Sequence, residues 1–353
     1  MSLLVEKIDS LANQIGRPVK LMEVCGTHTV AIFRHGIRDL LPEDISLLSG
    51  PGCPVCVTAI KDIETAIAIS RQDGVILITF GDMMRVPGGR QSLYDVRAEG
   101  ADIRIVYSPL DALKIASENK DKKVIFFATG FETTAPSVAA TILEAEIRGI
   151  ENFYIHSAHK LVPPALNALL DSDSVNVDGF ILPGHVSTII GSRPYEFIAT
   201  KYKKASVITG FDADGILQGI IMLLEQIASG RADVEIQYKR VVKEHGNPKA
   251  VSLINEYFEP CNAYWRGIGL IPESGLKLRD KFMQRDIKSY FEPSVPDYPE
   301  PKVCSCGEVL RGIKIPTDCL LFGKACTPDK PVGACMVSTE GSCAAYYKYG
   351  VSR

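Results

Sequence analysis

Short β-branched and apolar runs alternate with helical patterns from residue 20 to about residue 230. The runs read KLMEV, ISLLS, VILITF and IRIVYS, followed by KVIFFAT, FYIHS, GFILPG and SVITG. Between them, stretches such as CVTAIKDIETAIAIS and SVAATILEAEIRG repeat apolar residues at the spacing of a helix with one buried face. Strands that alternate with helices in this way are typical of βαβ units, so the pattern predicts an α/β fold with parallel strands.

The second set of four strands resembles the first. VCGTHTVAI (24–32) aligns with ATGFETTAPSV (128–138), LLSGPGCPVC (47–56) with IHSAHKLVPP (155–164), and ITFGDMMRVPGG (78–89) with ILPGHVSTIIG (181–191). The offset stays near about 104 residues, as a duplicated unit would give. We therefore expect two similar parallel-sheet α/β halves, residues 20–120 and 121–230. Their strand-end loops would face one central cleft, because ligands bind at the carboxyl ends of parallel strands.

The pattern changes after about residue 230. EYFEPCNAYWRGIGLIPESGLKL has no clear periodicity, and the proline-rich YFEPSVPDYPEPKVCSC leads into six cysteines between Cys304 and Cys343. A small domain has too small a hydrophobic core to be stable by itself, so its cysteines are expected to bind a stabilising cofactor. We expect residues 231–353 to form a C-terminal, mostly irregular and helical iron–sulfur domain, with an N-terminal helix over residues 1–19 packed on it.

Length and composition agree with this plan. A chain of 353 residues exceeds what one core usually organises. Hydrophobic residues make up 46%, and a formal net charge of -3 gives no electrostatic reason to expect nucleic acid or an anionic membrane as a partner. MSLLVEKIDSLANQIG has no basic start followed by an apolar core, and no apolar run approaches the ~20 residues that cross a bilayer. We predict a cytoplasmic protein whose ten cysteines are metal ligands or redox thiols rather than disulfides.

Two cysteine motifs lie at predicted strand ends. EVCGTHT places Cys25 and His28 around a glycine, and GPGCPVC places Cys53 and Cys56 at the start of a helix. A helix N-terminus stabilises a thiolate, so we expect Cys25 to be anionic, and Cys53 and Cys56 to form a redox dithiol with at least one pKa below ~8.5. Inert packing or half of a zinc site are the alternatives for the pair, although the chain has no second Cys-x-x-Cys to complete a zinc site.

The tail holds a second group of thiols. Loops rich in Gly, Pro and small residues, which let the backbone wrap around a cluster, separate Cys319, Cys326, Cys335 and Cys343. Four thiolates suffice for a [4Fe–4S] cluster, whereas structural zinc sites favour tighter Cys-x₂₋₄-Cys spacing. Cys304 and Cys306 remain as alternative ligands or as a redox pair beside the cluster.

Polar residues follow two further strands. GFETTAP offers Glu132, Thr133 and Thr134, and PGHVS offers His185 and Ser187. A polar group at a strand end has little packing value, although a single histidine is more often structural than catalytic. Convergence of Glu132 and His185 with the cysteines of the two earlier motifs would favour a functional site. The chain has no phosphate-binding P-loop, and no Gly-x-Gly-x-x-Gly opens a helix, so we expect no ATP or NAD site.

Together, CGTHT, GPGCPVC, GFETTAP, PGHVS and the tail CxLFGxACTPxxPxGACMVSxEGxC resemble the HypD family of [NiFe]-hydrogenase maturation proteins over nearly the whole chain. The resemblance implies a scaffold that works with the small chaperone HypC and the cyanide-donating HypE, and on which the Fe(CN)₂CO unit of the hydrogenase is assembled. It further implies that Cys25 shares the iron with a HypC cysteine, that Cys53 and Cys56 are the redox dithiol, and that the tail holds a [4Fe–4S] cluster.

Elementary chemistry agrees with these implied roles. Low-spin iron that carries cyanide and carbonyl is soft and suits a thiolate, and fixing the diatomic ligands requires electrons that a cluster and a dithiol can relay. His28 would polarise the Cys25 thiolate or the incoming ligand. Such a protein is an assembly scaffold with redox-active thiols rather than a conventional turnover enzyme.

Two other functions use the same cysteines. An iron–sulfur thiol–disulfide oxidoreductase acting on protein disulfides would need Cys53, Cys56 and the tail, but it gives no role to Cys25, His28 or Glu132. A structural zinc protein would be colourless.

Overall fold

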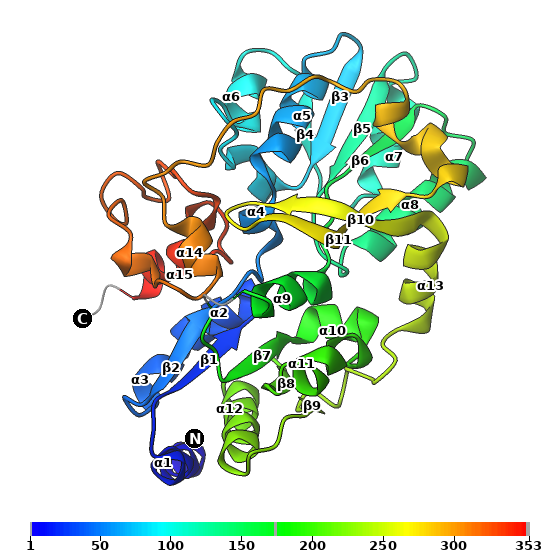
Figure 1. The fold of residues 1–353 in the computed structure, drawn as a ribbon. Coiled ribbons are helices and arrows are strands. Elements are labelled where there is room, and N and C mark those ends of the chain that lie inside the picture. Colours follow the sequence, from blue (N-terminus) through cyan, green and yellow to red (C-terminus); the bar gives the residue numbers. More distant parts are fainter. Residues whose placement is uncertain (1, 173–174, 351–353) are drawn as a thin grey trace.

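The computed structural model describes residues 2–172 and 175–350, and two parallel sheets organise them (Figure 1). The five-stranded sheet has the order β2-β1-β7-β8-β9, with β1 (Val19–Glu23), β2 (Ile45–Ser49), β7 (Gly179–Pro183), β8 (Ala205–Thr209) and β9 (Val234–Ile236). The four-stranded sheet has the order β4-β3-β5-β6, with β3 (Val75–Thr79), β4 (Ile103–Ile105), β5 (Lys123–Ala128) and β6 (Phe153–Ser157). The predicted α/β class with parallel strands is confirmed.

The sheets do not follow the expected contiguous halves. Strands β1 to β4 belong to the first repeat and β5 to β8 to the second, yet β2-β1 pairs with β7-β8 and β4-β3 pairs with β5-β6. Each sheet therefore takes the opening two strands of one repeat and the closing two of the other, in equivalent order. The boundaries 20–120 and 121–230 are wrong for this reason: a repeat shows which strands are alike, but not which strands pair.

Helices cover both sheets. The helices that follow strands of the five-stranded sheet are α2 (Gly26–Arg34), α3 (Ile37–Leu40), α4 (Pro54–Val57), α10 (Gly184–Ile190), η2 (Arg193–Tyr195), α11 (Glu196–Thr200) and α12 (Ala213–Ala228). Those around the four-stranded sheet are α5 (Ile60–Ser70), η1 (Gly81–Arg85), α6 (Leu93–Ala98), α7 (Asp111–Glu118), α8 (Ala135–Ile147) and α9 (Val162–Leu170). Strands β3, β7 and β8 are buried along their whole length, as strands covered on both faces must be. None of the helices in the described part of the chain is long and apolar enough to cross a membrane.

The first helix, α1 (Ser2–Ile15), lies at the bottom of Figure 1 beside α12. Its apolar stripe buries Ile8 and Ala12 in a cluster that includes Ile220 and Leu224 of α12. The expected packing of this helix on the cysteine-rich region is therefore wrong, since the apolar partner of the stripe is α12.

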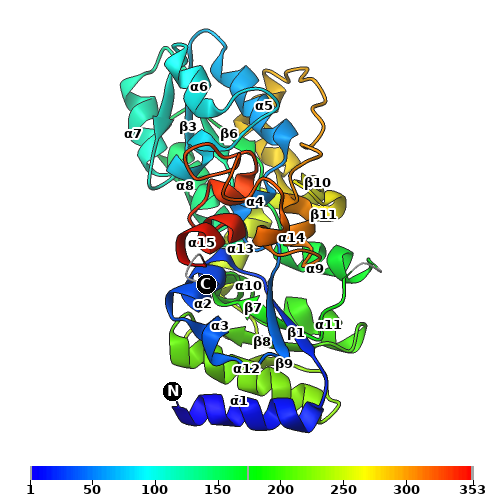
Figure 2. The same ribbon diagram turned by 90° about the vertical axis from the view of Figure 1, so that its left-hand side faces the viewer.

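The third domain is smaller than the expected 231–353. Strand β9 belongs to the five-stranded sheet, and α13 (Pro248–Tyr257) and the antiparallel hairpin of β10 (Phe258–Trp265) and β11 (Gly269–Leu278) pack with α8 in the apolar cluster of the four-stranded sheet. Short helices follow, namely η3 (Asp280–Arg285), η4 (Ile287–Ser289), α14 (Cys306–Leu310), η5 (Pro316–Asp318), η6 (Ala334–Met336) and α15 (Ser342–Tyr349). The cysteine-rich region, residues 303–350, lies between the two sheets in Figure 2; residues 351–353 lie outside the described part of the chain.

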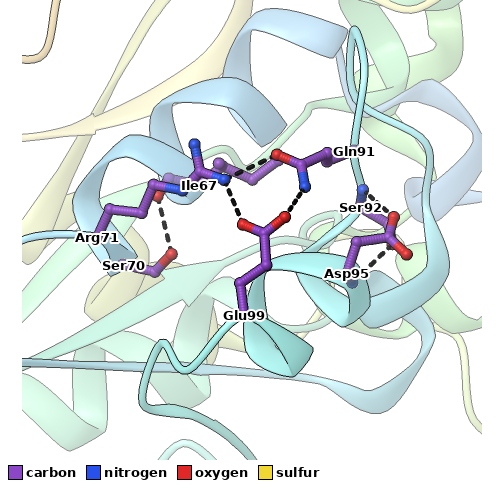
Figure 3. A network of polar contacts seen from close by, with 7 residues as sticks. All are labelled: Ile67, Ser70, Arg71, Gln91, Ser92, Asp95 and Glu99. Atoms are coloured by element: carbon purple, nitrogen blue, oxygen red, sulfur yellow. Dashed lines mark hydrogen bonds and ion pairs between the residues drawn. The ribbon is translucent and has the colours of Figure 1, made fainter.

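A polar network fixes α5 against α6 (Figure 3). The Arg71 guanidinium donates to Gln91 Oε1 and Glu99 Oε2, both at 2.7 Å, and Gln91 donates to Glu99. Ser92 and Asp95 form a capping box at the start of α6. Because α5 follows the Cys53-x-x-Cys56 segment directly, this network anchors the chain that leaves the dithiol.

Candidate functional site

Cys25 and Cys53 meet where two neighbouring parallel strands end. Cys25 is the N-cap of α2 after β1, and Cys53 is the N-cap of α4 after β2. The Gly26 N–H donates to the Gly52 carbonyl at 3.0 Å. A Cβ at Gly52 would lie 2.2 Å from the Cys25 nitrogen, so only glycine allows the GPGC loop to cross Cys25. Both thiols thus lie at strand ends, as predicted from the sequence.

An aromatic stack lies next to Cys25. The His28 ring stacks on Phe211 with centroids 4.6 Å apart, and His185 also stacks on Phe211, at 4.0 Å. His28 Nε2 lies 2.9 Å from the Gly210 carbonyl oxygen, which can only accept, so Nε2 carries the proton. Burial lowers the His28 pKa to about 4, and the ring is therefore neutral. Its Nδ1 is buried without a hydrogen-bond partner among the described residues and presents an open lone pair.

The Cys25 thiol is protonated in this environment. Burial raises its pKa to about 12, the backbone N–H of His28 opposes the rise, and the Glu340 carboxylate adds to it. The expectation of an anionic Cys25 is therefore wrong for the thiol as it stands, because burial outweighs the helix N-terminus. His28 acts on the sulfur through its backbone.

Glu340 is a site residue that the sequence analysis missed. The Thr27 hydroxyl donates to Glu340 Oε1 at 2.7 Å, although the two residues are 313 positions apart. A Cβ at Gly26 would lie 2.4 Å from the Glu340 carbonyl oxygen, so the tail presses directly on the start of α2. In the sequence, Glu340 is marked only as an acidic residue before a glycine in STEGSC. No local pattern indicates that it contacts the CGTHT motif.

Glu132 approaches the same region from the four-stranded sheet. Its Oε1 accepts from the Val162 N–H at 3.0 Å, its Oε2 has no partner among the described residues, and burial raises its pKa to about 7. Glu132 and Cys25 both act on the buried phenol of Tyr195 and raise its pKa, after burial itself. Tyr195, which no motif indicated, therefore lies within electrostatic range of both predicted residues.

Of three other predicted polar residues, Thr133 and Thr134 have local roles or none, whereas Ser187 also interacts with Tyr195. Thr133 is exposed, the Thr134 hydroxyl donates to the Phe131 carbonyl at 3.2 Å, and the Ser187 hydroxyl donates to the Pro183 carbonyl at 2.7 Å.

All six tail cysteines line one cavity of about 10 Å³, namely Cys304, Cys306, Cys319, Cys326, Cys335 and Cys343. Cys56 joins them, because its thiol interacts with that of Cys335. Cys335 also interacts with Cys306 and Cys343, and Cys306 with Cys304. Figure 2 shows the elements concerned, α4, α14 and α15, close together between the sheets.

The thiols suit a metal cluster by their chemistry but are not arranged as a finished site. No group of three or more His, Cys, Asp or Glu side chains in the described ranges has the geometry to hold a metal ion. The cavity has room for about one water molecule, so the thiols would move apart around a cluster. Burial raises the Cys56 pKa well above its usual value, so Cys56 is not the low-pKa thiol expected in this pair.

Comparison with known proteins supports a specific family. A family model described as HypD, the hydrogenase formation hypA family, matches residues 1–350. A hydrogenase maturation factor HypD of Azotobacter vinelandii is 48% identical over 344 residues, which cover 96% of this chain and 91% of that protein. Similar factors from Rhodobacter capsulatus (46% identity over 359 residues; 99% and 95% covered) and Escherichia coli K12 (44% over 347 residues; 98% and 92% covered) extend over the same length.

Proposed function

Because the chain belongs to the HypD family of hydrogenase maturation factors, we propose that it is the scaffold on which the Fe(CN)₂CO unit of a [NiFe] hydrogenase is assembled. The observation that carries this proposal is the surroundings of Cys25. Its thiol lies where two strands end, with Cys53 on the neighbouring strand end, the neutral His28 on the same helix and the Glu340 carboxylate from the tail.

Iron is the substrate in this proposal, and Cys25 is its ligand. The resting thiol keeps its proton, because the Cys25 pKa is about 12 while that of His28 is about 4. Binding of iron deprotonates a coordinating thiol outright, so the free thiol stays inert until its cargo arrives. The ionised fraction of Glu132, whose pKa is about 7, can take up the proton released.

A [4Fe–4S] cluster held by the tail would supply electrons. The spacing of the cysteines suggests Cys319, Cys326, Cys335 and Cys343 as its ligands. The contacts favour a second set, because Cys306 and Cys335 interact with each other and Cys335 reaches Cys56. In that arrangement Cys306 and Cys335 form a dithiol between the cluster and the Cys53/Cys56 pair, and Cys304 replaces Cys335 as the fourth ligand.

Partners of the HypC and HypE type would complete the assembly. A hollow of about 690 Å³ beside α2 is lined by Thr27, Val30, Met336, Val337 and Tyr347 among others. Its apolar lining would bind a partner protein that brings a second thiolate. The alternative, a general protein-disulfide oxidoreductase, fits less well, because Cys53 is 3% exposed and Cys56 fully buried.

Maturation in a host that lacks its own HypD-family protein tests the proposal. We expect the unaltered chain to restore [NiFe] hydrogenase activity and Cys25→Ala to restore none. Cys261→Ala is the matched control, because Cys261 lies on β10 and does not line the thiol cavity. Activity of the Cys25→Ala protein equal to that of the control would overturn the scaffold role.

A further inference from the structure

A second large cavity borders the tail thiols. It has a volume of about 680 Å³ and is lined by the start of α5, the turn of the β10–β11 hairpin, residues 295–302 and the start of α14. Cys304 and Cys306 form part of its wall. Nothing in the proposed assembly of the iron unit uses this cavity.

Contacts of the buried Arg266 and the half-buried Tyr298 hold the cavity in shape. The Arg266 side chain is 3% exposed, donates to the Pro87 carbonyl at 2.8 Å and pairs with Glu300 at 3.4 Å. The Tyr298 ring packs so closely on Gly89 that a Cβ there would lie 2.1 Å from it. The proline-rich segment 295–302 therefore contacts the rest of the protein at two points along the cavity, through Tyr298 and through Glu300.

The charges that line the cavity favour an anion. Of its three carboxylates, Glu300 is paired with Arg266, and Glu308 with Lys314 at 2.7 Å. The remaining charged residues in the lining are one carboxylate, Asp297, and three cations, namely Lys61, Lys302 and Arg311. A cleft with an excess of positive charge raises the local concentration of anions.

One cysteine in the cavity wall contacts the buried thiols of the interior. Cys306 lines the cavity and interacts with Cys335, and Cys335 interacts with Cys56. A reductant in the cavity would therefore reach Cys306 first, and electrons would pass inward by thiol–disulfide exchange.

We propose that this cavity binds an anionic low-molecular-weight thiol, which reduces a disulfide between Cys306 and Cys335. This inference rests on the thiol relay of the proposed function. The thiolate of the ligand attacks the Cys306 sulfur, the Cys306–Cys335 bond breaks, and Cys335 leaves as a thiolate that takes up a proton. A second ligand thiolate attacks the ligand sulfur of the mixed disulfide, which releases the oxidised ligand and returns Cys306 as a thiol. Two ligand thiols are oxidised, and one protein disulfide is reduced.

The test compares two reductants of opposite charge on the full chain oxidised with diamide. Anionic 3-mercaptopropionate and cationic cysteamine are added at equal thiolate concentration and low salt, and free thiols are trapped by alkylation and mapped by mass spectrometry. The test variant is Lys61→Glu/Lys302→Glu, and the control is Lys120→Glu/Lys239→Glu; all four lysines are exposed, and the control pair does not line the cavity.

We expect Cys306 and Cys335 to be reduced before Cys53 and Cys56, and about tenfold faster by the anionic thiol. The preference should vanish in the test variant and persist in the control. Equal rates with both thiols, an unchanged preference in the test variant, or reduction that begins at Cys53 would each overturn the proposal. A Cys25→Ala protein that supports maturation would instead refute the scaffold role and leave this result untouched, so the two failures are distinguishable.

Discussion

Burial governs the ionisation of the residues around Cys25. It raises the pKa of Cys25 to about 12 and those of Glu23 and Glu132 to about 7, and it lowers that of His28 to about 4. Cys25 and His28 are therefore neutral at pH 7, whereas Glu23 and Glu132 are each about half protonated there. The charge of the site at neutral pH is thus set by these two carboxyl groups.

The pH dependence of stability should report Glu132. The pKa of this carboxyl is 4.5 in the unfolded chain and about 7 in the fold. Between pH 4.5 and 7 the folded protein therefore binds more protons than the unfolded chain. Stability from this group is thus present below pH 4.5 and lost as the pH rises to 7, on the order of 3 kcal/mol. We expect Glu132→Gln to reduce the fall in unfolding free energy across this window, measured by urea titration at several pH values.

Glu23 contributes a slope of the same sign, so Glu132→Gln should not abolish the fall. Glu43→Gln, at an exposed position, is the control and should leave the slope unchanged. A slope in Glu132→Gln equal to that of the control would show that Glu132 is ionised in the fold.

Gly52 should be irreplaceable, because its loop touches the Cys25 backbone. A Cβ there would lie between 2.2 and 2.5 Å from three backbone atoms of Val24 and Cys25, which cannot move aside as a side chain could. We expect Gly52→Ala to cost about 1–3 kcal/mol of unfolding free energy and to displace Cys25. In the matched Gly81→Ala the nearest atom is 3.6 Å away, so a cost there as large as at Gly52 would contradict this account.

At the scale of elements, the turn between η6 and α15 covers the start of α2. Glu340 holds it there through Thr27, and the flanking Cys335 and Cys343 tie it to the thiol cavity. We expect Glu340→Ala to release this cover, to lower the Cys25 pKa, which the carboxylate raises, and to speed alkylation of Cys25 severalfold.

Glu43→Ala serves as the comparison for alkylation, since Glu43 is exposed and lies outside α2 and the tail. Mass spectrometry of the labelled protein gives the rate at Cys25 alone. Unaltered labelling of Cys25 in Glu340→Ala would mean that the tail does not limit access to this thiol.

The two candidate ligand sets make opposite predictions for Cys304 and Cys335. If Cys306 and Cys335 form the inner dithiol, anaerobic Cys335→Ser protein should keep the brown colour and about four iron and four sulfide per chain, whereas Cys304→Ser should lose them. The spacing-based set predicts the reverse. Stoichiometric zinc without sulfide in the unaltered protein would exclude both sets.

At the scale of the whole molecule, local patterns were predictable and long-range pairing was not. The strands, the parallel arrangement and the positions of Cys25, Cys53 and Glu132 at strand ends follow from alternating periodicities. The exchange of strand pairs between repeats, the packing of α1 on α12 and the contact of Glu340 with Thr27 depend on tertiary contacts that no local pattern records. The pKa of Cys25 was mispredicted for the same reason, since burial is a property of the whole fold.

Infrared spectroscopy of the complex with a HypC-type chaperone tests the central claim most directly. The chain is purified anaerobically with that partner, once unaltered and once as Cys25→Ala, and the cyanide and carbonyl stretching region is recorded. Because Cys25 is the proposed iron ligand, we expect the bands in the unaltered complex and none in Cys25→Ala, although the variant folds and keeps its brown colour. A Cys25→Ala complex that still shows the cyanide and carbonyl bands would contradict the assignment of Cys25 as the ligand of the assembled iron.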